Sequence, residues 1–251
     1  MADLNVCIED LIAANRILAA EGVVDSFGHV SVRHPIRPDR FLISRNKSPQ
    51  IVGPEDIMEM DFEGNEVNPS GRAPYGERFI HAAIYAARQD VGAVVHSHSR
   101  TTNPFGVTED RIRPITHVSV TIGSEVPVWD PQDRFGDTNM LVSSMELGHD
   151  LARSLAGRPT ILMRGHGSTI VGQQLRDAVY TAVYLEVNAQ LQLQAKLLNA
   201  GPIKFLTPGE IEKFAAHLNQ HKPNAGYDKA WENWCLKCGL PYKPLSTHKR
   251  A

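Results

Sequence analysis

The stretch ERFIHAAIYAARQDVGAVVHSHS, residues 77–99, joins a predicted helix to a predicted strand that ends in two histidines. Apolar side chains recur at helical spacing over residues 75–88, and the short apolar run at residues 91–95 is typical of a buried strand. His96 and His98 follow that run. Because side chains two positions apart on a strand point to the same face, both imidazoles can reach one ion. The stretch therefore predicts part of a metal site at a strand end.

A mononuclear metal site needs at least one more ligand, and His166 in the segment RGHG is the best candidate. It too follows an apolar strand, TILM, and Gly165 and Gly167 allow backbone to pass close to a ligand. Three imidazoles leave coordination positions open, which is typical of a catalytic rather than a structural ion. The other interpretation, an ordinary pair of surface histidines, weakens once His166 and Glu77 are considered together.

Predicted helices and strands alternate along the rest of the chain. Helical spacing covers residues 5–21, 145–156 and 175–198, and Thr207 with Pro208 and Glu210 has the pattern of a helix start. Short strands are predicted in VSVRHP, RFLISR, both halves of IMEMDFEGNEV, PITHVSVTIG, VPVWD and PTILMRGHGSTIVG. No repeat or low-complexity linker divides the chain. We expect a single domain over residues 1–251, with residues 220–251 as a C-terminal tail or lid.

Composition excludes several classes of partner. The 251 residues include 26 Lys and Arg against 28 Asp and Glu, without a basic stripe for nucleic acid or a polybasic segment for a membrane surface. The N-terminus has acids and Asn where a signal peptide needs a positive end and an apolar run. No stretch approaches the roughly 20 apolar residues of a membrane-spanning helix. The 3 cysteines are too few for a secreted disulfide framework. We expect a cytoplasmic protein.

The run E-x3-H-x3-Y-x2-R-x-D followed by V-H-S-H, in residues 77–98, resembles the class II aldolase and adducin family. So do GHVSVR near the N-terminus and RGHG followed by a long helix ending in YLEVNAQLQLQ. The resemblance covers residues 5–215 and implies an α/β fold: one three-layer α/β/α domain with a mixed, largely antiparallel central sheet. It also implies a homotetramer with active sites at subunit interfaces. Carried over, it makes Glu77 an acid/base near a divalent metal ion bound by His96, His98 and His166.

Three positions depart from the sugar-phosphate aldolases that this family contains. Those enzymes bind phosphate with Gly-Asn, Thr-Gly and Ser-Ser pairs, where this chain has Gly28-His29, Ser44-Arg45 and Tyr75-Gly76. Arg45, with Lys47 nearby, offers a carboxylate a planar and bidentate partner. His29 could donate to a phenolic oxygen or accept from a phenolic hydroxyl. This pattern resembles the decarboxylase branch of the family, which acts on hydroxylated aromatic or heteroaromatic dicarboxylates and related ring-cleavage products.

The sequence therefore predicts a metal-dependent carboxy-lyase. Glu77 would carry a proton to the carbon that loses CO2, provided that burial raises the pKa of its carboxyl toward neutrality; the alternative for Glu77 is an ordinary helix-start carboxylate. The predicted substrate-binding residues are His29, Ser44, Arg45, Tyr75 and, on a predicted strand, His117. Imidazole ligands suit zinc, iron, cobalt and nickel, and a nearby carboxylate keeps manganese open.

Two other functions stay open. One is a retro-aldolase or epimerase that uses the same ion on a small hydroxy-carbonyl or sugar-phosphate substrate. The other is a non-catalytic, adducin-like interaction module, which would not need an open metal position.

Weaker signals lie outside the predicted site. His81, one helical turn after Glu77, is expected to orient that glutamate or to pack. Arg164 could touch a substrate carboxylate. A structural zinc site is conceivable from Cys235, Cys238, His217 and His221, although isolated thiols are the default. An aromatic stripe of Tyr227, Trp231 and Trp234 is best explained by packing, with closure over a neighbouring subunit's active site as the alternative.

Overall fold

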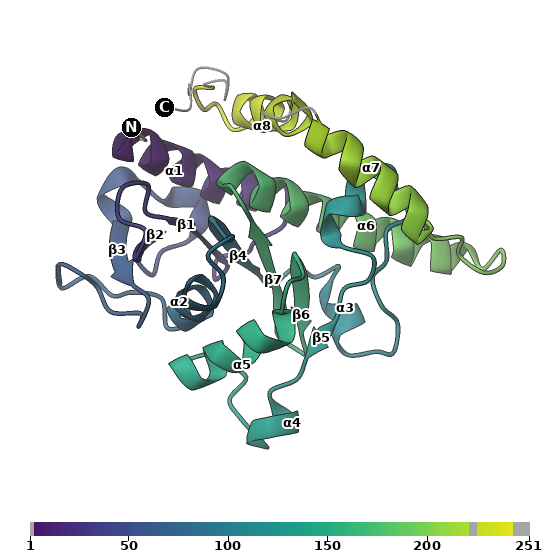
Figure 1. Cartoon of the computed structure of the whole chain (residues 1–251), viewed down its shortest axis with the longest axis horizontal. Coiled ribbons are helices and arrows are strands. Elements are labelled where there is room, and N and C mark those ends of the chain that lie inside the picture. Colours follow the sequence, from purple (N-terminus) through teal and green to yellow (C-terminus); the bar gives the residue numbers. More distant parts are fainter. Residues whose placement is uncertain (1–2, 221–224, 243–251) are drawn as a thin grey trace.

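The computed structural model describes residues 3–220 and 225–242. A seven-stranded sheet in the order β3-β2-β1-β4-β7-β6-β5 forms its centre (Figure 1). Neighbouring strands pair antiparallel except β5 and β6, which are parallel. The predicted mixed, largely antiparallel sheet is confirmed. The strands are β1 (His29–Arg33), β2 (Arg40–Ser44), β3 (Ile57–Asp61), β4 (Ala93–Ser97), β5 (Val128–Trp129), β6 (Thr160–Met163) and β7 (Gly167–Gly172).

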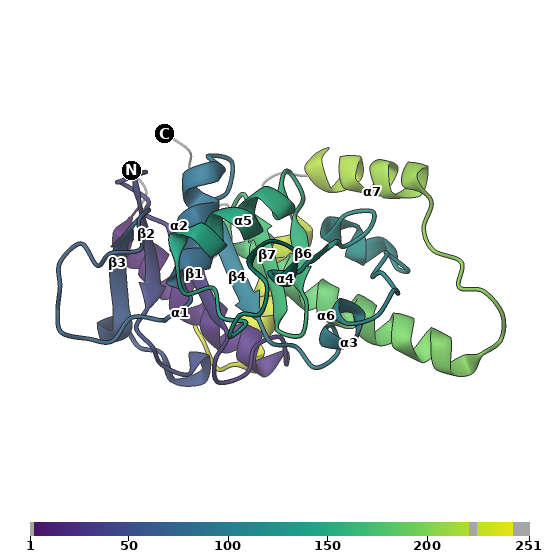
Figure 2. The same ribbon diagram turned by 90° about the horizontal axis from the view of Figure 1, so that it is seen from below.

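Helices cover both faces of this sheet and complete the predicted α/β/α layering (Figures 1 and 2). One layer contains α1 (Leu4–Ala20), α6 (Leu175–Leu198) and α8 (Ala225–Lys237), and the other contains α2 (Arg78–Ala87) and α5 (Met145–Leu155). The remaining helical segments are α3 (Asn103–Gly106), α4 (Gln132–Phe135), α7 (Pro208–Gln220) and the 3-10 turns η1 (Pro49–Ile51), η2 (Pro54–Asp56) and η3 (His117–Ile122).

Alternation along β4 determines which side chains face which layer. Val95 packs in the core beneath α1 and α6, whereas Val94 packs in the core against α2 and α5. His96, two residues after Val94, therefore points to the α2–α5 side. His29 of β1 is the register partner of His96 and shares this side. The sheet thus places both of these histidines on the face that packs against α2 and α5.

A tight turn places His166 beside the end of β4. Met163 of β6 pairs with Gly167 of β7, and Gly165 between them has φ +63°, a conformation that glycine adopts without steric cost. β7 in turn pairs with β4, so that Ser97 lies opposite Ser168. This double pairing brings the two predicted ligand segments to one end of the sheet.

Several local predictions are confirmed at the ends of the chain. The helix over residues 175–198 has the predicted bounds, and α7 begins with the predicted reciprocal cap: Thr207 Oγ1 accepts from the Glu210 N–H at 3.2 Å, and Glu210 Oε2 accepts from the Thr207 N–H at 2.8 Å. Trp231 and Trp234 of α8 are buried in the core cluster with α1 and α6, as the packing interpretation predicts.

Two predicted strands are wrong. The segment PITHVSVTIG forms the 3-10 turn η3, because it packs on α6 and α7 while the short β5 occupies that edge of the sheet. Tertiary contacts override the β-propensity of its valines and threonine here. The second half of IMEMDFEGNEV makes only one bridge, between Met60 and Glu66. Of the four conceivable zinc ligands, Cys235 and Cys238 are free thiols on or just after α8, and His221 lies outside the described residues.

None of the helices in the described part of the chain combines the length and the apolar character needed to cross a bilayer.

Close contact between β4 and β7 generates the first prediction. A Cβ atom on Gly167 would lie 2.0 Å from the Ser97 carbonyl oxygen, so the two strands would have to separate. Gly167→Ala is expected to lower the free energy of unfolding by about 2–3 kcal/mol, which corresponds to a Tm decrease of roughly 5–10 °C. Gly157→Ala is the matched control, because a Cβ atom there meets nothing within 4 Å. Equal thermal unfolding curves for the two variants would contradict the close approach.

Candidate metal centre

Three imidazole nitrogens converge where β4 ends and the β6–β7 turn begins. His98 Nε2 lies 2.9 Å from His96 Nε2 and 3.1 Å from His166 Nε2. Glu77 Oε2 joins them, 3.3 Å from His166 Nε2 and 3.7 Å from His96 Nε2. One ligand atom from each of the four residues lies within 4.8 Å of the others. The fold thus brings together the three histidines that were expected to bind an ion and the glutamate that was expected to act beside it, and we call these four residues the histidine–glutamate cluster.

The direction of the Glu77 side chain argues against an ordinary helix-start role. Glu77 is the N-cap residue of α2 but makes no side-chain capping bond to that helix. Instead its Oε1 atom accepts the backbone N–H of Val142 at 2.9 Å, and its Oε2 atom faces the histidines. The carboxylate is therefore held in the cluster from outside its own helix.

The outer nitrogens of two histidines indicate that the cluster suits a cation. His166 Nδ1 lies 2.9 Å from the Met140 carbonyl oxygen, and His98 Nδ1 lies 3.3 Å from Asp25 Oδ1. Metal-bound histidines commonly donate their second N–H to such acceptors. With hydrogen on Nδ1, the facing Nε2 atoms present lone pairs that repel each other unless a cation lies between them. Their separations are close to the roughly 3.3 Å between nitrogens on a tetrahedral ion with bonds of about 2.0 Å. His96 Nδ1 is buried without a partner.

Burial keeps two of the candidate ligands, His96 and His98, in the form that binds a metal. Desolvation, followed by the neighbouring rings, lowers the pKa of His96 well below its ordinary value. Desolvation and then His166 lower the pKa of His98 as well. Because metals bind neutral imidazole, these rings need not release a proton before they coordinate an ion near pH 7.

The sequence-based prediction for Glu77 required the pKa of its carboxyl to be raised toward neutrality, and the structure does not meet this condition. Burial alone would raise the pKa of this carboxyl, but the hydrogen bond with His166, the nearby imidazoles and the Val142 N–H together lower it to about 2. Glu77 is therefore a carboxylate at neutral pH. It can take up a proton first and release it later, and it adds a negative charge to a cation site.

Three of the predicted substrate residues lie on the β1–β2 side of the cluster. The His29 ring centroid is 5.0 Å from that of His96 and 4.5 Å from that of Tyr75. The Tyr75 hydroxyl donates to the Lys47 carbonyl oxygen. The Ser44 hydroxyl is buried without a well-formed hydrogen bond, although it is near enough to Tyr75 to lower that phenol's pKa against the larger effect of burial.

Arg45 is not a free cation, because Asp56 lies between it and Lys47. Arg45 Nε is 2.6 Å from Asp56 Oδ1, and Lys47 Nζ is 2.6 Å from Asp56 Oδ2, which also accepts the Gly53 N–H at 2.8 Å. Although burial raises the pKa of Asp56, these hydrogen bonds lower it to about 2. One carboxylate between two cations leaves one positive charge in excess, and the Arg45 side chain is 38% exposed.

The structure does not connect His117 to the cluster. His117 begins the turn η3, is exposed, and sets the edge of its ring against Phe214 of α7 at 4.9 Å between centroids. Arg164 pairs with Asp130. The role of His117 in substrate binding thus stays a prediction without a supporting contact within this chain.

Sequence reasoning missed the groups that support the ligands. Asp25 contacts His98 and also accepts the backbone N–H groups of Phe27 at 2.9 Å and Gly28 at 3.1 Å, which is an Asx-turn that the letters DSFG could have indicated. The Met140 carbonyl could not be found in this way, because a backbone oxygen has no sequence signature. Met140 has φ +67°, rare for a residue with a side chain, and this local strain accompanies its contact with His166.

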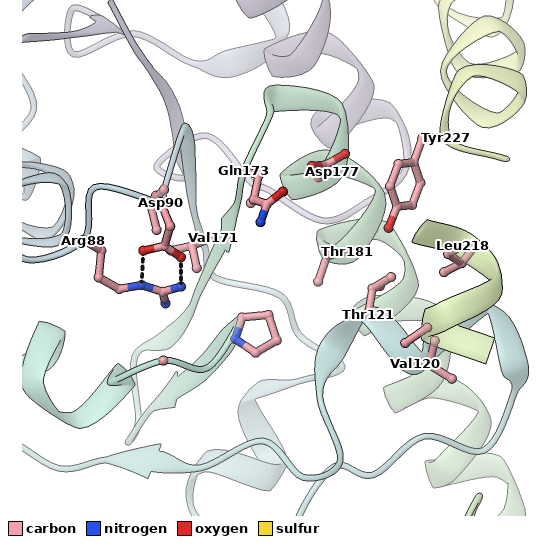
Figure 3. A pocket seen from close by; sticks show the side chains of 15 residues that line it. Arg88, Asp90, Val120, Thr121, Val171, Gln173, Asp177, Thr181, Leu218 and Tyr227 are labelled. Carbon is pink, nitrogen blue, oxygen red and sulfur yellow. Dashed lines mark hydrogen bonds and ion pairs between the residues drawn. The ribbon is translucent and has the colours of Figure 1, made fainter. Parts of the chain in front are cut away.

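A cavity of about 390 Å³ lies away from the cluster (Figure 3). Its walls include Val91 and Gly172, at the ends of β4 and β7 opposite to His96 and Gly167. Figure 3 shows the ion pair between Arg88 and Asp90 in its wall. None of the cluster residues lines it, so this hollow and the candidate chemistry are separate.

Comparison with known proteins connects this geometry to a family. Residues 9–193 match the family described as Class II Aldolase and Adducin N-terminal domain. The chain is 34% identical over 213 residues to the decarboxylase tropJ of Talaromyces stipitatus, covering 80% of each protein. It is 31% identical over 240 residues to the 3,4-dihydroxyphthalate decarboxylase of a Terrabacter species, covering 90% of this chain and 94% of that protein.

A solved structure supports the same fold. The L-fuculose 1-phosphate aldolase from Glaciozyma antarctica aligns with a TM-score of 0.75 at 23% identity and covers 96% of each chain. The names of these relatives support an enzyme of the lyase type.

Metal content tests the cluster directly. The wild-type protein is expected to bind about one divalent ion per chain, and His98→Ala to lower the affinity at least 100-fold, because it removes one of three imidazole ligands. Elemental analysis and isothermal titration with zinc would measure this. His149→Ala, at an exposed position on α5, is the matched control. Full metal content in His98→Ala would contradict the cluster, and wild-type protein that binds no ion would favour the non-catalytic module.

Proposed function

This chain belongs to the class II aldolase and adducin family, and on that basis we propose that it is a metal-dependent decarboxylase of a hydroxylated aromatic or heteroaromatic dicarboxylate, or of a similar enol acid. The observation that carries this proposal is the excess positive charge of Arg45 and Lys47 around Asp56, beyond Tyr75 and His29. Two relatives above 30% identity are named decarboxylases, one of them for a dihydroxylated aromatic dicarboxylate.

His96, His98 and His166 would hold the divalent ion, with the Glu77 carboxylate beside it. When bound, such an ion supplies Lewis-acid stabilisation of the negative charge that develops on an oxygen next to the breaking carbon–carbon bond. Three imidazoles with one carboxylate are compatible with zinc, iron, cobalt or manganese.

Glu77 would move the proton that decarboxylation requires. As a carboxylate it can take the proton of the substrate hydroxyl and then deliver it to the ring carbon that bears the departing carboxylate. When that carbon–carbon bond breaks, its electron pair flows toward the adjacent oxygen, CO2 leaves, and the resulting phenolate takes a proton from water. The Val142 N–H, at 2.9 Å from Glu77 Oε1, keeps one oxygen occupied, so that Oε2 is the atom that exchanges the proton.

The second carboxylate of the substrate would be bound by the Arg45 side. The rings of His96, His29 and Tyr75 follow one another at 5.0 and 4.5 Å, and the Tyr75 hydroxyl reaches the Lys47 backbone. These contacts link the cluster to the backbone of Lys47, which belongs to the cation pair around Asp56. Arg45, whose side chain is 38% exposed, is the cation of this pair that a second carboxylate would contact.

We also propose that the chain forms a homo-oligomer, in the manner of a tetramer with active sites at subunit interfaces. Phe27 is 69% exposed and Leu141 is 47% exposed, and they lie in the two segments that support the ligands through Asp25 and Met140. Large exposed apolar side chains beside a functional cluster suit a subunit contact. Native mass spectrometry that found only monomer at micromolar concentration would exclude this assembly.

Release of CO2 from a substrate panel tests the reaction. Metal-loaded protein is expected to decarboxylate at least one member of a panel of ortho-hydroxy aromatic and pyridine dicarboxylates. Glu77→Gln is expected to retain the ion but to lower kcat 100-fold or more, because the amide cannot exchange a proton. If no panel member releases CO2 while a free or phosphorylated sugar aldehyde reacts, the aldolase alternative is correct. A wild-type rate in Glu77→Gln would contradict the role of Glu77.

Substrate preference tests the cation pair. Arg45→Gln is expected to raise KM about tenfold or more for dicarboxylates, with a smaller effect on monocarboxylates, because one charge-assisted contact is lost. Arg40→Gln is the matched control, since Arg40 begins β2, the strand that ends just before Arg45, and pairs with Glu59 at 2.8 Å. Unchanged kinetics in Arg45→Gln would remove the support for an acidic second group on the substrate.

A further inference from the structure

We propose that a buried hydrogen-bond chain from Tyr85 through Ser31 and His81 fixes the tautomer of His29, so that His29 presents an Nε2–H donor to a substrate oxygen. Tyr85, Ser31 and His81 would then be positioning residues for a step in which they touch no substrate. The hydrogen-bond chain stands on its own geometry, whereas the identity of the accepting oxygen rests on the proposed function.

The hydrogen-bond chain is continuous and enclosed by protein. The Tyr85 hydroxyl lies 2.8 Å from Ser31 Oγ, Ser31 Oγ lies 2.6 Å from His81 Nδ1, and His81 Nε2 lies 2.6 Å from His29 Nδ1. All four side chains are buried, with between 0 and 2% of their surface exposed. β1 supplies two of the members and α2 supplies the other two. Each contact is short enough to be a full hydrogen bond.

Only one direction of donation satisfies every hydrogen in this chain. Burial lowers the pKa of His81 to about 3, so this ring is neutral, with one N–H and one acceptor nitrogen. If Tyr85 donates to Ser31, then Ser31 donates to His81, and His81 Nε2–H donates to His29 Nδ1. The hydrogen of His29 must then be on Nε2.

The opposite direction leaves the Tyr85 hydroxyl hydrogen unpaired. Ser31 Oγ is the one acceptor for this hydroxyl in the described part of the chain. The Val94 N–H and the Arg33 guanidinium, which also approach the phenol, donate only, and Phe41 and Phe62 are apolar. A buried hydroxyl without an acceptor disfavours that arrangement by roughly tenfold or more. Burial also raises the pKa of Tyr85, so the phenol keeps its proton and remains the terminal donor.

The last member of the hydrogen-bond chain, His29, reaches the candidate site. His29 is the register partner of His96, and their ring centroids are 5.0 Å apart. No group among the described residues hydrogen-bonds to His29 Nε2. This atom is nevertheless not fully enclosed by protein. The small accessible part of this ring therefore includes Nε2, where a substrate bound beside His96 can meet it.

A fixed donor at this position has a consequence for specificity. His29 would stabilise an oxygen that carries negative charge, such as a phenolate or a carboxylate, and would not take a proton from a hydroxyl at that atom. The proton removal assigned to Glu77 and the charge stabilisation assigned to His29 are then two different functions on one substrate.

Neutron diffraction on perdeuterated, zinc-loaded crystals tests the tautomer without an activity measurement. The expected result is deuterium on His29 Nε2 and on His81 Nε2, with none on His29 Nδ1. Deuterium on His29 Nδ1 would overturn the proposal even if the enzyme is a decarboxylase. Conversely, the expected pattern in a protein that releases no CO2 would leave the hydrogen-bond chain intact and reject the proposed reaction.

Kinetics of Ser31→Ala supply the second measurement. Removing the hydroxyl that donates to His81 Nδ1 lets the His81–His29 pair adopt either direction, so kcat/KM for the best substrate of the panel is expected to fall about tenfold while zinc content stays at one ion per protein molecule. Ser119→Ala, which removes a buried hydroxyl from η3, is the matched control. The His29 tautomer in Ser31→Ala crystals is expected to be mixed or reversed, which a loss of stability alone would not cause. An unchanged tautomer there would overturn the role of the hydrogen-bond chain.

Discussion

Convergence of three imidazoles and one carboxylate on a single point is the constraint on which the rest of this structure depends. His98 Nε2 lies about 3 Å from both His96 and His166, beside the Glu77 carboxylate. Polar groups at such distances need hydrogens or a cation between them. The close pairing of β4 with β7 and the outer contacts of Asp25 and the Met140 carbonyl hold these groups in place. Much of the local fold therefore serves to keep the candidate ligands together.

The α2–α5 face of the sheet carries the candidate chemistry beside a second apolar core. Beneath α1, α6 and α8, the strands bury mostly apolar side chains. On the α2–α5 side, the same strands place His29, Ser31 and His96 among polar partners from α2. Because side chains alternate along β1 and β4, a change on one face need not disturb the other. The candidate metal ligand His96 and the Tyr85–His29 chain share one face in this way.

Particular residues show how much of the fold and of the candidate site the sequence alone predicts. The strand period placed His96 and His98 on one face, and helical spacing gave the bounds of α6. The apolar strand before RGHG indicated His166 as the third ligand, and the family resemblance gave Glu77 its place beside the ion; the fold brings all four residues together. Short-range pattern could not show that η3 packs as a turn, since its β-branched residues favour a strand in isolation. Nor could it show the ionised state of Glu77, because that depends on neighbours distant in the chain.

The loop before α5 supports the cluster through its backbone alone. The Met140 carbonyl contacts His166 and the Val142 N–H contacts Glu77, while the Leu141 side chain between them points outward and is 47% exposed. Main-chain contacts persist when such an outward side chain is exchanged. An exchange at position 141 would therefore act first on whatever packs against the outer surface of this loop, while the atoms that support His166 and Glu77 stay where they are.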